Sequence, residues 1–82
     1  METITFSFKP EVSNERRSEV MHSIRSAPGI KSADMIVSAG PSSLTKLGYV
    51  VLMPDADKHD QLKFLRTWTE LEHIELAARR HL

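Results

Sequence analysis

The alternation of hydrophobic and polar positions along this chain predicts five elements and a sixth whose type is open. In the opening segment Ile4, Phe6 and Phe8 alternate with Thr and Ser, which is typical of a half-buried strand. Farther on, apolar side chains recur at helical spacing twice. The predicted elements are a strand at 2–9, a helix from 13 or 14 to about 26, strands at 30–38 and 44–53, and a helix from about 57.

Short polar motifs set the predicted ends of the helices. Ser13 or Asn14 is a favourable N-cap for the first helix, and Pro28-Gly29 is a favourable stop. Asp55 and Asp57 offer N-caps for the second helix, where a hydroxyl or carboxylate oxygen accepts hydrogen bonds from free backbone N–H groups.

The last segment, residues 70–82, fits two interpretations. Its residue types favour helix, and a continuous helix from Asp57 to Arg80 would leave the sheet with three strands. The alternation of Ile74, Leu76 and Ala78 instead favours a strand at about 73–79. With that strand the order is βαββαβ. This order predicts an α+β, ferredoxin-like sandwich in which a four-stranded antiparallel sheet carries two helices on one face.

The run from Leu47 to Met53 is apolar on both faces, although the predicted fold covers only one. Either Val50 and Leu52 point to the helices, or Tyr49, Val51 and Met53 do. The set on the other face is either a group of tolerated surface residues or a contact surface for another protein. The predicted core is Ile4, Phe6, Val20, Ile24, Val50, Leu52, Leu62 and Leu65.

Composition describes an ordinary folded domain. The 82 residues suit a single domain, 1–82, with 11 basic and 11 acidic side chains and no cysteine. Balanced charge gives no general attraction to nucleic acid or membrane. With no apolar run near the ~18 residues of a membrane span, we expect a cytoplasmic protein.

No catalytic, cofactor or metal site is evident in the sequence. The four histidines lack the spacing that would aim two imidazoles at one ion. The Asp55, Asp57 and Asp60 cluster lacks the Gly and the distal Glu of a calcium loop. We therefore expect a protein that is not an enzyme and that binds neither a cofactor nor a metal.

The segment that begins at Lys46 resembles one of the motifs of RNA-recognition domains. Lys46, Gly48 and Tyr49 match that motif, but Val51 stands where a second stacking aromatic belongs. RNA binding is therefore a minor alternative.

Three segments resemble the propeptides of subtilisin-type proteases and the small inhibitors related to them. These are Ile4 to Lys9, Gly48 to Leu52 with a Pro shortly after, and His73-Ile74-Glu75. The resemblance implies that the open sheet face packs on a protease and that the C-terminal tail enters its active-site cleft. The implied contact residues are Tyr49, Val51, Met53, Arg79, Arg80, His81 and Leu82.

The sequence therefore predicts a non-enzymatic module that binds a protein partner, or a second copy of itself, through the open sheet face. The alternative is a propeptide-like inhibitor of a subtilisin-type serine protease. Neither nucleic acid nor membrane is an expected partner.

Overall fold

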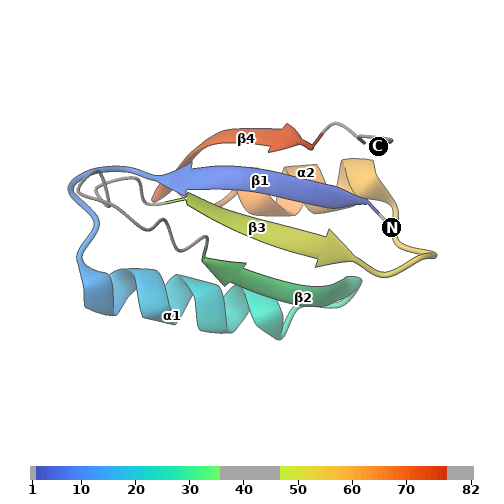
Figure 1. Ribbon diagram of the computed structural model, residues 1–82, viewed down its shortest axis with the longest axis horizontal. Coiled ribbons are helices and arrows are strands. Elements are labelled where there is room, and N and C mark those ends of the chain that lie inside the picture. Colours follow the sequence, from blue (N-terminus) through green and yellow to red (C-terminus); the bar gives the residue numbers. More distant parts are fainter. Residues whose placement is uncertain (1, 36–46, 78–82) are drawn as a thin grey trace, which may run out of the picture.

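The computed structural model describes residues 2–35 and 47–77, which form a four-stranded antiparallel sheet and two helices of the α+β class (Figure 1). In chain order the elements are β1 (Thr3–Phe8), α1 (Asn14–Arg25), β2 (Ile30–Met35), β3 (Leu47–Leu52), α2 (Lys58–Arg66) and β4 (Leu71–Leu76). The predicted strands at 30–38 and 44–53 are thus described over 30–35 and 47–52. The loop expected at 39–43 lies outside the described residues.

The strands lie in the order β2-β3-β1-β4, and each neighbouring pair is antiparallel. It follows that β1 and β2 run parallel with β3 between them, and that β3 and β4 run parallel with β1 between them. Each strand-helix-strand unit is therefore split by one strand of the other. The edge strands are β2 and β4, and α1 packs along β2 while α2 packs along β4 (Figure 1).

Both helices begin where the polar motifs predict, and α1 also ends where they predict. The Ser13 hydroxyl accepts a hydrogen bond from the backbone N–H of Arg16 at 3.1 Å, and α1 ends before Gly29, whose φ is 84°. The Asp57 carboxylate accepts from the backbone N–H groups of His59 and Asp60 at the start of α2. Within the described residues, neither helix is long and apolar enough to cross a membrane.

The core lies between the two helices and one face of the sheet. Burial alternates along β1 and β3, so Phe6, Val50 and Leu52 are buried while their neighbours in the strand are half-exposed. Of the predicted core, Leu62 alone is only partly buried, at the margin of the cluster. The buried residues are Ile4, Phe6, Phe8, Val12, Val20, Met21, Ile24, Ile30, Ala33, Val50, Leu52, Leu65 and Leu71.

The last described segment is a strand, so the alternative of one long helix is wrong. α2 ends at Arg66, and β4 pairs with β1 from Leu71 to Leu76. The strand starts earlier than the predicted 73–79 because its pairing with β1 shifts between Thr5 and Ser7, a β-bulge that breaks the simple alternation. Residues 78 and 79 lie outside the described residues.

Candidate functional site

The face of the sheet that points away from the core is the candidate site, and we call it the open face. Cross-strand partners place their side chains on the same side of a sheet, so the pairing fixes its members. Among the described residues no helix lies on this face. Its members are Thr3, Thr5 and Ser7 of β1, Leu47, Tyr49 and Val51 of β3, Ser32 and Asp34 of β2, and Glu72 and Glu75 of β4.

The two central strands give the open face a row of large side chains beside a row of small ones. Leu47, Tyr49 and Val51 are all half-exposed on β3. Their partners on β1 are Ser7 opposite Leu47, Thr5 opposite Tyr49 and Thr3 opposite Val51. The surface is therefore higher along β3 than along β1.

Gly48 explains why the side chains of Tyr49 and Val51 point to the open face. It lies opposite Phe6 on the core side, and a Cβ built there would lie 2.5 Å from Cζ of the Phe6 ring. The ring thus occupies the space over the glycine, and the residues in phase with it, Val50 and Leu52, are buried as well. Tyr49 and Val51 must then point outward, because successive side chains of a strand alternate.

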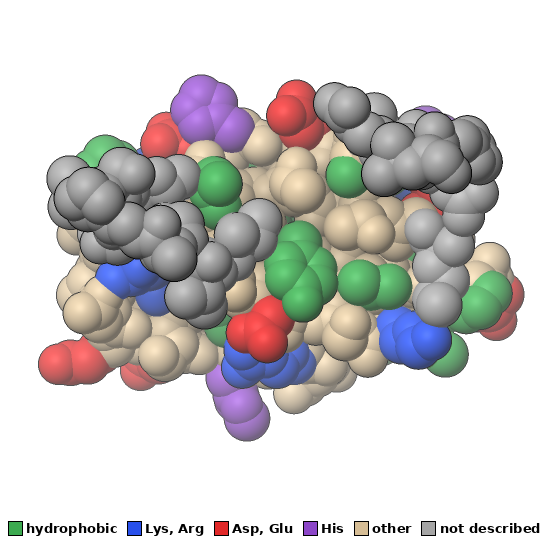
Figure 2. Space-filling view, viewed as in Figure 1, with side chains coloured by type: hydrophobic (Ala, Val, Ile, Leu, Met, Phe, Trp, Pro, Cys, Tyr) green, Lys and Arg blue, Asp and Glu red, His purple; other side chains and the backbone are tan. Residues whose placement is uncertain are grey.

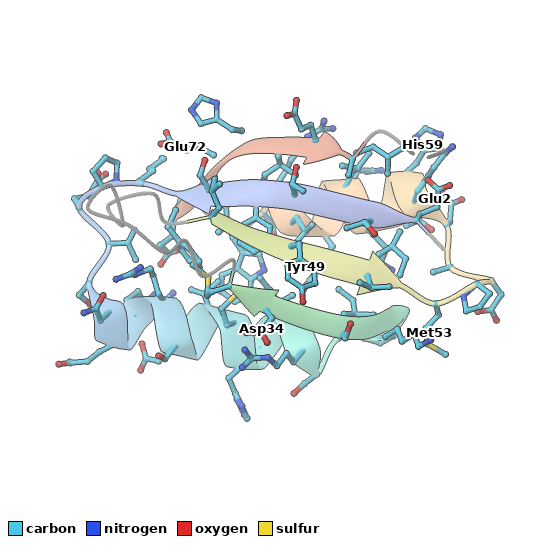
Figure 3. The ribbon with its side chains drawn as sticks, in the orientation of Figure 1. Glu2, Asp34, Tyr49, Met53, His59 and Glu72 are labelled. Carbon is cyan, nitrogen blue, oxygen red and sulfur yellow. The ribbon has the colours of Figure 1, made fainter. Side chains whose placement is uncertain are left out.

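The third predicted contact residue on this strand, Met53, lies one residue beyond the end of β3. Its side chain is 42% exposed, and its backbone N–H donates to the carbonyl of Gly29 at 2.8 Å. Figure 3 shows it at the rim of the sheet, away from Tyr49. The structure therefore brings Tyr49 and Val51 together on the open face and leaves Met53 at its margin.

The β2 edge carries a cation that caps the exposed strand backbone. Arg25, the last residue of α1, donates from Nε to the carbonyl of Ala33 at 2.8 Å, and its guanidinium lies 3.4 Å from the carboxylate of Asp34. Asp34 is paired with Tyr49 in the register, and Figure 3 shows the two side chains close together. Satisfying an edge carbonyl in this way hinders pairing with another strand.

The β4 edge carries two carboxylates that sequence reasoning did not assign to the site. Glu75 is opposite Thr5, and Glu72 is opposite Ser7 and is labelled at this edge in Figure 3. His73 between them has a φ of 54°, the left-handed region that favours glycine, which is where the bulge absorbs its extra residue. The Thr and Ser alternation of β1 was the sequence signal for this face, but the register of β4 had no local signal.

A shallow groove of about 260 Å³ lies on the open face beside the bulge. It lies over β1, between β3 and β4, and its lining includes Thr5, Ser7, Leu47 and Glu75. The small side chains of β1 form its floor. The groove therefore lies beside the row of larger side chains on β3 and is the lower part of the same surface.

Away from the open face, an exposed ion pair joins α1 to the residue before β4. Arg16 of α1 donates from Nε to the carboxylate of Glu70, before β4, at 2.6 Å, and also lies 3.4 Å from Glu19. The hydrogen bond to Glu70 raises the pKa of Arg16, and the same bond lowers the pKa of Glu70. The pair joins the start of α1 to the strand at the opposite end of the chain.

Across residues 2–35 and 47–77, no three His, Asp or Glu side chains come together in a way that could hold a metal ion. Asp57 caps α2. The predicted tail contacts, Arg79, Arg80, His81 and Leu82, lie outside the described residues, as does Lys46 of the RNA-binding motif.

Comparisons with protein-family models, with curated proteins and with solved structures find no match to this chain.

Proposed function

We propose that this chain is a non-catalytic protein-binding module that acts through the open face of its sheet. One observation carries the proposal: β3 presents the row of Leu47, Tyr49 and Val51 on a face that the described part of the chain leaves without a covering layer. The core on the opposite face is filled by the two helices. Within residues 2–35 and 47–77, the row is therefore accessible to another molecule.

The row has the chemistry of a protein contact. Full burial of a Val or Leu side chain contributes ~1.5–3 kcal/mol, and because Leu47 and Val51 are already partly buried, covering each of them contributes at most about 1 kcal/mol. Tyr49 combines an aromatic ring with a hydroxyl, and Tyr is enriched at protein interfaces. The flanking carboxylates Glu72 and Glu75 oppose binding of a polyanion, which favours a protein over RNA.

As part of the same proposal, we assign the fold as ferredoxin-like. The support is the interleaving of two split strand-helix-strand units in the order β2-β3-β1-β4. The cytoplasmic location expected from the sequence stays a prediction.

Val51→Lys tests the function. Val51 is half-exposed, so the variant should stay folded, while an unpaired ammonium in the contact should weaken binding by a few kcal/mol. Val50→Lys is the matched control: it is one residue away, fully buried, and should unfold the domain. The measurements are circular dichroism, sedimentation over a range of concentrations and titration with subtilisin. Unfolding of Val51→Lys, or unchanged association by both measures, would contradict the proposal.

A second candidate, inhibition of a subtilisin-type protease, is favoured by the position of β4. The segment that resembles the last strand of protease propeptides pairs with β1, and the N–H of Ala77 donates to the carbonyl of Thr3 at 2.8 Å. Deleting residues 79–82 should abolish inhibition of subtilisin and leave self-association unchanged. Inhibition that survives the deletion would rule out a role for the tail.

A further inference from the structure

We propose that the cleft between α1 and the end of β2 binds a small amphipathic carboxylate, a molecule with one carboxylate group and a short apolar chain. This site is separate from the open face, and the inference goes beyond the proposed function. The cleft has a volume of about 310 Å³, which is within the usual range of ligand pockets. The described residues that line it are Asn14, Arg17, Ser18, Met21, Arg25 and Met35.

The cleft lies on the helix side of the sheet. Met35, the last residue of β2, pairs with Gly48 and therefore points to the same side as the core. The other lining residues all belong to α1, and their spacings from Asn14 are close to whole turns, so they share one face of the helix. Figure 2 shows the opposite side of the sheet, the open face, where hydrophobic side chains gather over the middle. The two surfaces can therefore be tested independently.

The observation that carries the inference is a cation without a partner. The Nε atom of Arg17 is buried and has no hydrogen-bond partner, and within residues 2–35 and 47–77 its guanidinium forms no ion pair. The other buried side-chain atom without a partner in these residues, Nε1 of Trp68, belongs to a neutral group. Burying a charged donor without an acceptor is unfavourable. Because folding has already removed part of the water around Arg17, an anion that binds this guanidinium has less water to displace than on an open surface.

The charges around the cleft favour an anion. No Asp or Glu is among the described residues that line it. Glu15 and Glu19 lie on α1, but they are rotated by roughly 100–140° around the helix from the lining face. Asp34 of β2 is 3.4 Å from the guanidinium of Arg25, with which it forms an ion pair. Arg17 is therefore the cation that a ligand can neutralise.

The lining combines polar donors with an apolar surface. Asn14 and Ser18 are one turn apart beside Arg17, and their amide and hydroxyl groups can donate hydrogen bonds to an anion. The planar fork of a guanidinium matches the two oxygen atoms of a carboxylate. Met21 and Met35 supply the apolar part, and methionine side chains adapt to ligands of different shapes. An inorganic anion would leave the methionines uncovered, so a carboxylate with an apolar chain fits the cleft better.

A titration of isotope-labelled protein with sodium octanoate, followed by NMR, tests the site. The backbone amide signals of Ser18, Met21 and Met35 should shift together and reach saturation. Octylammonium has the same chain and the opposite charge, and it should cause no saturable shift at these positions. Octanoate should bind about tenfold more tightly than butyrate, because each fully buried methylene strengthens binding roughly threefold to fourfold and the cleft covers the chain only in part.

Substitutions at two neighbouring arginines separate binding from folding. Arg17→Met removes the charge and keeps an unbranched apolar stem, so it should weaken octanoate binding by about tenfold. It should also be at least as stable as the wild type, because it removes a buried nitrogen without a partner. Arg17→Lys keeps the charge without the planar fork and should bind octanoate with intermediate affinity. Arg16→Met is the matched control: Arg16 donates to Glu70 at 2.6 Å and lines a different cleft, so octanoate binding should be unchanged.

Three results would overturn the inference. They are the absence of a saturable shift at tens of millimolar octanoate, equal binding of octanoate and octylammonium, and an equal loss of binding in Arg16→Met and Arg17→Met. Val51→Lys, on the opposite side of the sheet, should leave octanoate binding unchanged. A failure of the cleft to bind octanoate would therefore leave the proposed role of the open face standing, and a failure of the open face would leave the cleft standing.

Discussion

Replacing Gly48 by Ala gives a sharp test of the packing that orients β3. The added Cβ would lie 2.5 Å from Cζ and 2.6 Å from Cε1 of the Phe6 ring. Carbon atoms in contact are normally ~3.5–4.0 Å apart, so the ring must move by about 1 Å. Phe6 is 1% exposed and surrounded by the core, which leaves the ring no open space to enter.

Two opposing effects set the magnitude. Overpacking a core costs ~1–3 kcal/mol, whereas replacing Gly by Ala inside a regular element gains ~0.5–1 kcal/mol from reduced backbone freedom in the unfolded chain. We therefore expect Gly48→Ala to lower the free energy of unfolding by about 1 kcal/mol. For a domain of this size, that corresponds to a fall of ~4–8 °C in Tm.

The assay is a double-mutant cycle of Gly48→Ala with Phe6→Leu, followed by urea and thermal unfolding. Leucine has no ring atoms at the positions that clash, so the methyl group is tolerated in the double variant. Its loss of stability should be smaller than the sum of the single losses by at least ~0.5 kcal/mol. If Gly48→Ala is as stable as the wild type, or if the two changes are additive, Phe6 does not pack over Gly48 and the pairing of β1 with β3 is wrong.

Two further predictions concern the core and the Arg16–Glu70 pair. Phe6→Ala should cost ~3–5 kcal/mol, a large part of the stability of an 82-residue domain, and unchanged thermal unfolding would contradict the placement of β1. The pKa of Glu70 is lowered in the fold, so its contribution is present above its ordinary value of 4.5 and is lost as the pH falls through the folded value. The stability difference between wild type and Glu70→Gln should therefore shrink below about pH 4.5, and a difference that is constant from pH 7 to pH 3 would exclude this linkage.

Much of the fold is predictable because its signals are local. The strict alternation around Phe6 assigns β1 and its buried face, and the side chains of Ser13 and Asp57 cap the helices that the sequence predicts there. Each of these features depends on residues within one turn or one strand. Local rules therefore give the first five elements and their order.

The edges of the site depend on contacts that are distant in the sequence. β4 is paired with β1 from Leu71, but its bulge puts two residues between the partners of Ser7 and Thr5, so the spacing from Glu72 to Glu75 has no simple alternation. When the alternation is counted from Ile74 onward, the predicted start of the strand is too late. The acidic edge of the open face could not be predicted, because the register that creates it joins residues about 70 positions apart.

The orientation of β3 shows how one core contact also fixes the surface. From the sequence, either of the two sets of apolar side chains on β3 could face the core. A shift of one residue in the pairing would exchange the buried set with the outward set. Gly48 removes this ambiguity, because the Phe6 ring leaves no space for a side chain at its position, and the in-phase residue Val50 is then buried too. Tyr49 and Val51 are outward because of that contact. The contact between Phe6 and Gly48 therefore determines both the packing of the core and the orientation of the contact surface. A variant that disrupts this contact should weaken association at the open face and also lower the free energy of unfolding.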